Sequence, residues 1–379
     1  MEVTSANVWV GKNRFERRTL PLPEPPEQGL LLEVTANGIC GTDVHLVGQD
    51  PTAAMILGHE IVGRIVAFGP GHPHTDAEDQ PLREGDTVAL FPWVPCLTCW
   101  SCRRFGPGAT TCSEPFVYGV PPEAIGLTPC ATDESLSLTG GFGRHLAVRP
   151  GTYLWRVPQS LSPAVASLLD PLAVAVRCVD LARTAPGAWD EVLTPDATAV
   201  VLGAGAIGLL TSLALRQVGV GTVVVSGSRP GRLEVARELG IDRVMDIGEL
   251  GVDERRRAVH DMTGGRGADL VIDATNSPAA LSEALAMVRR LGTVIEVGNI
   301  VPTGSSITVD PARDICQRSV RLLGVSFNPP RSYTEGMALL ARNGSIPFER
   351  LITRSFSFDD IGSALEALGG DAVKVTLTV

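Results

Sequence analysis

The chain has 379 residues, more than one hydrophobic core usually holds, so we expect two domains. Its 44% hydrophobic and 20% charged residues are typical of a globular protein and exclude a disordered one. The net charge of −10 would repel phosphate backbones and anionic lipid surfaces, so we expect neither nucleic acid nor a membrane as a partner.

The N-terminal part of the chain predicts a β-rich domain over residues 1–161, because short valine- and glycine-rich segments dominate there. Residues 1–20 lack the uninterrupted apolar core of a secretion signal and carry no mark of a transit peptide, which predicts a cytoplasmic location. The chemically interesting residues of this domain fall into two groups of potential metal ligands.

The segments GICGTDVHL and LGHEIVG form the first group. They contain Cys40, Thr42, Asp43, His45, His59 and Glu60. One thiolate and one imidazole, with a further protein ligand and an open position, make up a catalytic zinc site. Taken singly these residues indicate little, because a lone cysteine or histidine is usually a packing or satisfied polar residue. The third protein ligand would come from elsewhere in the chain.

Half of the chain's eight cysteines lie in a lobe at about residues 95–113, and they are Cys96, Cys99, Cys102 and Cys112. In a reducing compartment this spacing favours a metal over disulfides, and zinc takes four thiolates in a tetrahedron. Four thiolates leave no position for a substrate, so this zinc would be structural. An iron–sulfur cluster and a group of buried free thiols are the alternatives. The isolated Cys130, Cys178 and Cys316 are interpreted as packing residues.

The segment SPAVASLLDPLAVAV predicts linking helices at the start of a second domain over residues 162–326. Ser162 would precede the first helix, and Pro163 would occupy its first turn. Asp170 stands before Pro171, a position that disfavours helical geometry, so Asp170 would cap the next helix. Such a cap does not exclude metal binding by the same carboxylate.

From about residue 198 the pattern predicts a doubly wound parallel sheet, the Rossmann type of α/β fold. The apolar segments AVVLGAG, GTVVVSG, ADLVIDAT, GTVIEVG and VRLLGVSF alternate with helical segments. The first strand leads through a glycine-rich turn into a helix, where a pyrophosphate can bind the backbone amides. The predicted dinucleotide-binding residues are Gly203, Gly205, Ala206, Ile207 and Gly208. A glycine turn that only packs helix on sheet is the alternative.

The second strand of this fold ends without the acidic residue that would bind the ribose hydroxyls of NAD. Ser226, Gly227, Ser228 and Arg229 stand there, with Arg232 one turn later. A glycine leaves room for a 2′-phosphate, and guanidinium and hydroxyl groups can bind it. The sequence therefore favours NADP over NAD. The alternative is that both arginines are solvated charges, although cations are disfavoured at a helix start.

In combination these motifs resemble the zinc-containing medium-chain dehydrogenase/reductase superfamily, with its alcohol, sorbitol and threonine dehydrogenases. The resemblance covers nearly the whole chain and rests on GICGTD, GHE, GDTVAL, DPLAVA, GAGAIG and the terminal VKVTLTV. It implies a GroES-like catalytic domain, to which residues 327–379 return, and an active site in the cleft between the domains. It also implies two zinc ions per chain, one catalytic and one structural, and a homodimer or homotetramer.

The resemblance further implies a set of metal ligands. Cys40 and His59 would bind the catalytic zinc with Asp170 as the third ligand, and Glu60 would lie behind the metal or exchange transiently onto it. The spacer before Cys112 is longer than the family usually has, which puts this ligand of the lobe in more doubt than the other three. The lengthening still permits a four-sulfur site, because loop closure depends only weakly on length.

Roles in catalysis are implied for the residues around these ligands. Thr42 would accept the hydrogen bond of the substrate hydroxyl and pass the proton through the cofactor ribose toward His45. Asp43 would fix the His59 imidazole, with Lys374 as its counter-charge. The expected function is hydride transfer between a small alcohol or carbonyl substrate and NADP(H). The alternatives are a zinc-free quinone or enoyl reductase and a non-enzymatic NADP-binding protein stabilised by zinc.

Overall fold

The computed structural model describes residues 2–106, 111–121, 123, 138–183, 192–301, 304–342 and 346–379. The chain divides into two compact units, Met1–Asp170 together with Pro329–Val379, and Pro171–Asn328. The units change after Asp170 and after Asn328, whereas the sequence predicted boundaries after residues 161 and 326, so the start of the linking helices belongs to the first unit. Cys130 lies outside the described residues.

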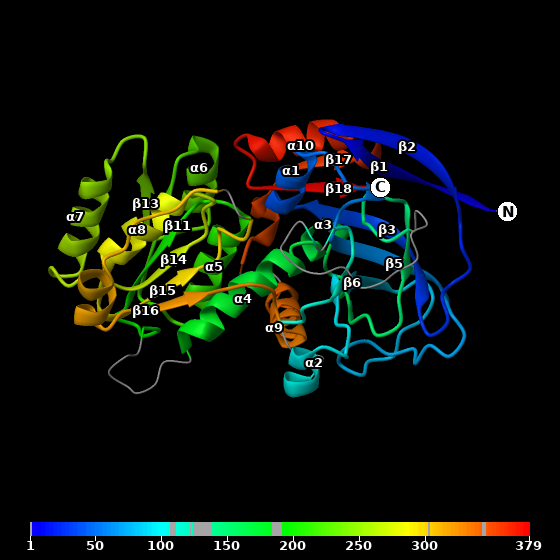
Figure 1. Ribbon diagram of the computed structural model, residues 1–379, viewed down its shortest axis with the longest axis horizontal. Coiled ribbons are helices and arrows are strands. Elements are labelled where there is room, and N and C mark those ends of the chain that lie inside the picture. Colours follow the sequence, from blue (N-terminus) through cyan, green and yellow to red (C-terminus); the bar gives the residue numbers. More distant parts are fainter. Residues whose placement is uncertain are drawn as a thin grey trace. The chain divides into compact units, whose positions relative to one another are not determined.

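The first unit is built on a mostly antiparallel sheet whose strands follow the order β10-β6-β5-β3-β18-β17, with β9 also pairing with β3 (Figure 1). Its members are β3 (Leu30–Ile39), β5 (Glu60–Phe68), β6 (Thr87–Leu90), β9 (His145–Val148), β10 (Leu154–Arg156), β17 (Ile352–Ser357) and β18 (Lys374–Thr378). The C-terminal strand β18 lies between β3 and β17, so the end of the chain completes this sheet.

Two smaller sheets and several helices accompany this sheet. The smaller sheets contain β1 (Val3–Gly11), β2 (Arg14–Pro21) and β4 (Met55–Ile56), and β7 (Trp93–Val94) with β8 (Phe116–Val117). The helices are α1 (Gly41–Val47), α2 (Trp100–Phe105), α3 (Pro163–Ala166), α9 (Pro330–Ala341), α10 (Ile361–Gly369) and the 3-10 turns η5 (Phe348–Leu351) and η6 (Phe358–Asp360). Alternating valine, leucine and isoleucine side chains of β3 and β5 form the centre of the core.

The entry into α3 follows its sequence signals, but the entry into α4 (Leu169–Arg183) does not. Ser162 caps α3 by accepting a hydrogen bond from the Val165 amide at 3.2 Å, with Pro163 in the first turn. Asp170 is not an N-cap as predicted, because it already lies inside the first turn of α4. A proline near a helix start removes no intrahelical hydrogen bond, so the chain continues through Pro171 in spite of the local preference.

The second unit contains a six-stranded, wholly parallel sheet in the order β13-β12-β11-β14-β15-β16 (Figure 1). The strands are β11 (Thr198–Leu202), β12 (Thr222–Gly227), β13 (Arg243–Asp246), β14 (Ala268–Asp273), β15 (Val288–Glu296) and β16 (Arg321–Gly324). The order reverses at β11, as in dinucleotide-binding sheets, which confirms the predicted fold. The sequence did not single out β13, which is short and has charged ends.

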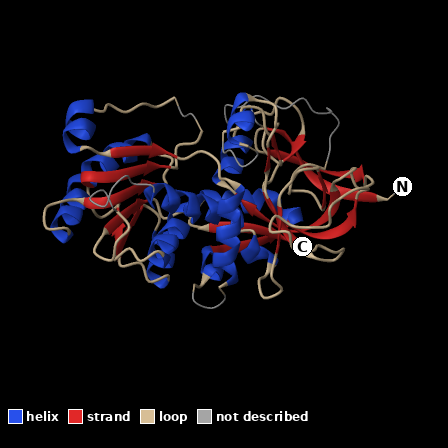
Figure 2. Ribbon diagram, turned by 90° about the horizontal axis from the view of Figure 1, so that it is seen from below, coloured by secondary structure: helices blue, strands red, loops and turns tan. Residues whose placement is uncertain are grey.

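Helices cover both faces of this sheet (Figure 2). Helices α5 and α6 pack against β11, β12 and β13, whereas α8 packs against β14 and β15. The elements that complete the unit are α5 (Ala206–Gln217), α6 (Pro230–Glu238), α7 (Val252–Met262), α8 (Pro278–Met287), the π-helix η3 (Pro311–Ile315) and the 3-10 turn η4 (Cys316–Arg318). Fully buried strand residues such as those of β11 explain the continuous apolar runs in the sequence. Among the described helices, none is long and apolar enough to cross a membrane.

Candidate active site and metal centres

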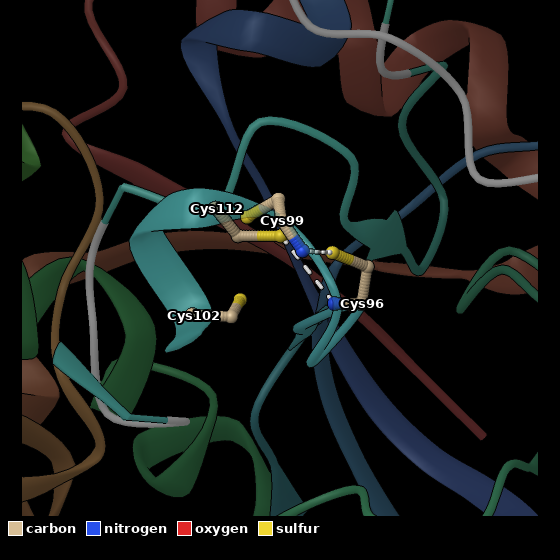
Figure 3. Close-up of side chains that lie close together, drawn as sticks. All are labelled: Cys96, Cys99, Cys102 and Cys112. Carbon is tan, nitrogen blue, oxygen red and sulfur yellow. Dashed lines mark hydrogen bonds between the residues drawn. The ribbon is translucent and has the colours of Figure 1, made fainter. Parts of the chain in front are cut away.

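The cysteine lobe brings its four sulfur atoms to within 4.8 Å of one another. Cys102 projects from α2, while Cys96, Cys99 and Cys112 lie on the flanking chain, and the side chains surround a common point (Figure 3). The Cys99 amide donates to Cys96 Sγ at 3.3 Å, and the Cys96 amide donates to Cys112 Sγ at 3.4 Å. Cys112 therefore joins the group in spite of the long spacer before it. Four convergent sulfurs that accept amide hydrogen bonds fit a tetrahedral zinc ion.

The protein environment acts unequally on the thiols of the lobe. Hydrogen bonds from the Cys102 and Ser113 backbone lower the pKa of Cys99 to about 5. Burial raises the pKa of Cys112 to about 12. The fold by itself thus favours a thiolate at one of these two positions only, and a cation would have to stabilise the other.

A second convergent group consists of Cys40, His59 and Glu60, whose ligand atoms also lie within 4.8 Å of one another. Cys40 follows β3 and is the N-cap residue of α1, while His59 and Glu60 lie at the start of the neighbouring strand β5. His59 and Glu60 are almost completely buried, and Cys40 is half-buried. The pairing of β3 with β5 thus joins two sequence motifs into one group of soft and hard metal ligands.

Asp43 contacts two of the three members of this group, Cys40 and His59. Its Oδ2 accepts a hydrogen bond from the Cys40 amide at 2.8 Å, and its Oδ1 lies 3.6 Å from Nδ1 of His59. Burial lowers the pKa of His59, but the charges of Asp43 and Cys40 outweigh burial and hold this pKa well above its usual value. The negative charges around His59 therefore favour a positive charge at this site, which a protonated imidazole or a bound metal cation would supply.

Glu60 forms an ion pair with Lys374 at the start of β18, and the Lys374 ammonium also donates to the Ile39 carbonyl at 2.9 Å. The ion pair that the structure gives Lys374 is thus with Glu60, whereas the sequence-based expectation named Asp43. Gly38 makes space for this pair, because a Cβ there would lie 2.0 Å from Glu60 Oε2. Within the described part of the chain, Glu60 Oε1 is buried without a hydrogen-bond partner.

Asp170 lies beside this group but outside the set of atoms within 4.8 Å. Its charge acts on Glu60, and its Oδ1 accepts a hydrogen bond from the hydroxyl of Tyr333. Burial, followed by the Asp170 charge, raises the pKa of Tyr333 well above its usual value. Tyr333 was not among the residues predicted from the sequence, and no local motif marks it.

The two residues predicted to move a proton lie on α1. Thr42 Oγ1 is 3.6 Å from Cys40 Sγ, so a hydroxyl stands directly beside a potential metal ligand. His45 is on the next part of the same helix and is exposed to solvent. The helix therefore extends from the thiol to the surface.

The glycine-rich turn joins β11 to α5 as predicted. Gly203 has a φ of +106°, which favours glycine, and a Cβ on Gly208 would lie 1.9 Å from the Gly203 carbonyl oxygen. A Cβ on Gly205 would meet only the Arg232 guanidinium, with Nη1 at 3.8 Å. Two glycines are therefore required by the turn itself, and the third leaves the N-terminus of α5, including Ala206, open to a ligand.

The end of β12 carries the residues predicted to select the cofactor. Ser226 and Gly227 are buried, while Ser228 is exposed and Arg229 is the N-cap residue of α6. A Cβ on Gly227 would lie 2.9 Å from Ala204 Cβ, so packing alone already requires a glycine there. The absence of a carboxylate at Gly227 therefore has a structural reason in the packing against Ala204.

Comparisons with known proteins agree with this architecture. The family models described as alcohol dehydrogenase GroES-like domain and zinc-binding dehydrogenase match residues 26–159 and 206–342. The 5-exo-hydroxycamphor dehydrogenase of Pseudomonas putida is 30% identical over 98% of both chains.

Solved structures show the same similarity over the whole chain. An alcohol dehydrogenase of Thermotoga maritima has a TM-score of 0.87 and 26% identity, with 100% of both chains covered. A zinc-binding dehydrogenase of Sinorhizobium meliloti bound to NADP has a TM-score of 0.80 and 25% identity, also with 100% of both chains covered. Together with the two domains and the convergent cysteine, histidine and acidic residues, these similarities show that the chain belongs to the zinc-containing medium-chain dehydrogenase/reductase superfamily and is an oxidoreductase of the alcohol dehydrogenase family.

Proposed function

We propose that the protein is a zinc-dependent oxidoreductase that transfers hydride between an alcohol or carbonyl substrate and NADP(H). The observation that carries this proposal is the convergence of Cys40, His59 and Glu60 next to the Thr42 hydroxyl. A zinc-free reductase or a merely zinc-stabilised protein would need no such group in addition to the cysteine lobe. The lobe would hold the second, structural zinc.

The residues of the proposed catalytic centre differ in their tasks. Cys40, His59 and Asp170 would hold the zinc, and Asp43 would orient the imidazole through its contact with His59 Nδ1. Glu60, tied to Lys374, would stand behind the metal. When bound, the zinc would act as a Lewis acid that lowers the pKa of a substrate hydroxyl.

The chain itself would handle the proton. Thr42 Oγ1, positioned by the N-terminus of α1, would accept the hydrogen bond of the substrate hydroxyl. The exposed His45 on the same helix would deliver the proton to water, since an imidazole can both accept and donate a proton. The nicotinamide would supply the hydride chemistry, while the β11–α5 turn would hold its pyrophosphate.

NADP preference is supported by the charges near the glycine-rich turn. The Arg232 guanidinium lies beside Gly205, and residues 228–233, which follow β12, include no aspartate or glutamate. An arginine–phosphate hydrogen bond is charge-assisted and often bidentate, so its loss has a large effect. We expect Arg232→Ala and Arg229→Ala each to raise KM for NADP by about tenfold or more, with a much smaller effect on KM for NAD. Equal effects on both cofactors would contradict the assignment.

The function is tested by measuring bound zinc and cofactor reduction on the same preparation. We expect two zinc ions per chain and NADP reduction with some member of a panel of linear, polyol and bicyclic secondary alcohols. Cys40→Ser should lose one zinc and all measurable cofactor reduction. A chain with one zinc that is lost in Cys99→Ser but kept in Cys40→Ser, and that reduces no cofactor, would overturn the proposal.

Assembly is the remaining part of the proposal. Because the resemblance to the superfamily implies a homodimer or homotetramer, we propose that the chain associates with itself. Sedimentation analysis of the purified protein over a range of concentrations measures this directly. A mass of one chain at every concentration would contradict it.

A further inference from the structure

A buried phenol contacts the carboxylate that we assign as the third metal ligand. Tyr333 on α9 is fully buried, and its hydroxyl donates a hydrogen bond to Oδ1 of Asp170 in the first turn of α4. The two residues come from distant parts of the chain and meet within the first unit. The contact therefore exists only in the folded protein.

The aromatic side chains around Tyr333 hold its ring in one place. The indole of Trp155 stacks on it, with ring centroids 5.0 Å apart and an interplanar angle of 24°. Phe91 meets it edge-on, with centroids 4.9 Å apart and an angle of 83°. Trp155 is itself fixed, because its Nε1 donates to Thr334 Oγ1 at 2.9 Å. A hydroxyl carried on such a packed ring is preorganised and loses little entropy when it makes its hydrogen bond.

The contact lies next to the proposed metal centre. The charge of Asp170 acts on Glu60, and the charges of Glu60 and Cys40 act on Tyr333. Asp170 itself remains outside the close group of Cys40, His59 and Glu60. The hydrogen bond from Tyr333 uses only part of the acceptor capacity of the Asp170 carboxylate, which has about four lone-pair sites, so the carboxylate can take a further ligand.

We propose that Tyr333 is a positioning residue of the metal centre, whose hydroxyl holds Asp170 so that its carboxylate binds the zinc. This inference rests on the proposed function, because it presupposes that Asp170 is a ligand. Partners that hold a metal ligand through a hydrogen bond typically change metal affinity by about 10–100-fold when they are removed. Tyr333 would act through Asp170 and would not touch the substrate.

Tyr333→Phe tests the proposal because it removes only the hydroxyl and leaves the aromatic stack in place. The matched control is Thr334→Val, which removes a neighbouring hydroxyl that bonds to Trp155 and so tests the packing of the aromatic stack with the Tyr333 hydroxyl intact. The zinc-loaded full-length protein is mixed with a coloured chelator, and the release of each zinc is followed over time. We expect the zinc of the centre to leave at least about tenfold faster from Tyr333→Phe, and only slightly faster from Thr334→Val, because the second variant loosens the Trp155 anchor but keeps the Tyr333 hydroxyl.

Cobalt replacement supplies a second readout, because the visible absorption of Co²⁺ depends on its ligands and their geometry. The bands of the centre should shift in Tyr333→Phe, while the bands of the cysteine lobe should not. Unchanged release and unchanged bands in Tyr333→Phe would overturn the proposal. Equal changes in Tyr333→Phe and Thr334→Val would also overturn it, because packing would then be the cause.

A double variant separates this inference from the proposed function. If Tyr333 acts through Asp170, the change to Phe should have no further effect on zinc release in an Asp170→Ala background, which offers the hydroxyl no side-chain acceptor. If Tyr333→Phe accelerates zinc release as much in that background as in the wild type, the inference is contradicted. The wild-type protein could instead fail to reduce NADP with any alcohol while Tyr333→Phe still changes zinc release. That result would contradict the proposed reaction alone and leave the inference about Tyr333 in place.

Discussion

The cysteine lobe and the centre of Cys40, His59 and Glu60 reach the same close spacing of ligand atoms by opposite routes. The lobe takes all four sulfurs from residues 96–112, around the short helix α2. The centre joins the end of β3 to the start of β5, and its neighbours come from α4, α9 and β18. The lobe lies at the surface, where Trp100 is 73% exposed, whereas Glu60 is 1% exposed.

This difference shows which interactions stabilise each group of ligands. A loop of thiols can obtain much of its order from the metal that it binds. A buried centre must first balance its own charges with protein partners. Gly38 on β3 pairs with Glu60 on one side and with Thr376 of β18 on the other, so the strand register brings Lys374 to Glu60. The lobe is a local structure, and the centre is a product of the whole unit.

The largest effect on stability is expected from Lys374→Met, which leaves Glu60 as a buried charge without its partner. Such a loss typically costs about 3–5 kcal/mol, and we expect the free energy of unfolding in urea to fall by about that amount. The double variant Lys374→Met/Glu60→Gln should recover most of it, because no charge then remains to be buried. Equal losses in the single and double variants would show that Lys374 contributes packing alone.

A smaller loss is expected from Cys99→Ser in the lobe, because the damage stays within a surface segment. The free energy of unfolding should fall by about 1–3 kcal/mol, and proteolysis within the lobe should become faster. One zinc per chain should be lost, while the zinc of the centre stays. Loss of both zinc ions in Cys99→Ser would mean that the two groups are coupled and that the lobe is not a local structure.

A buried acidic pair, Asp273 and Glu296, provides a further comparison in the second unit. Asp273 at the end of β14 is fully buried, and burial together with the Glu296 charge raises its pKa to about 7. The unfolded chain would have a pKa near 3.9. Between these values the folded state binds more protons, so stability is fully present at about pH 4 and is lost as the pH rises through about 7.

Asp273→Asn should remove this dependence, because an amide does not titrate while it can still accept from Thr275. For the wild type we expect a slope of about 1 kcal/mol per pH unit between pH 5 and pH 7 in the free energy of unfolding. The variant should show a flatter curve and gain relative stability at pH 8. Parallel curves for the two proteins would contradict a protonated Asp273.

The smallest effect is expected from Trp100→Ser, although this residue lies between two cysteines of the lobe. Its side chain is largely exposed and contacts Phe105 edge-on, with ring centroids 5.5 Å apart. Exposed substitutions usually change stability by less than about 0.5 kcal/mol, and the bound zinc should remain at the wild-type level. Loss of zinc in this variant would show that the lobe depends on packing as well as on its sulfurs.

The sequence by itself was sufficient wherever the deciding residues are neighbours in the chain. The glycine-rich turn between β11 and α5, the Ser162 cap and the convergence of the lobe cysteines depend on spacings of a few residues, which a sequence displays directly. The alternation of apolar strands with helices predicted the parallel sheet of the second unit. Of its strands, the short β13 with its charged ends was not predicted. Fold class and family were therefore predictable.

Tertiary structure alone decided which residues compensate the buried charges of the centre formed by Cys40, His59 and Glu60. It pairs Lys374 with Glu60 and brings Tyr333 to Asp170. Each of these contacts joins segments that are far apart in the chain, and no periodicity or spacing encodes such a meeting. The physical reason is that a buried charge takes the partner that strand register and helix packing place beside it, and both are properties of the assembled core.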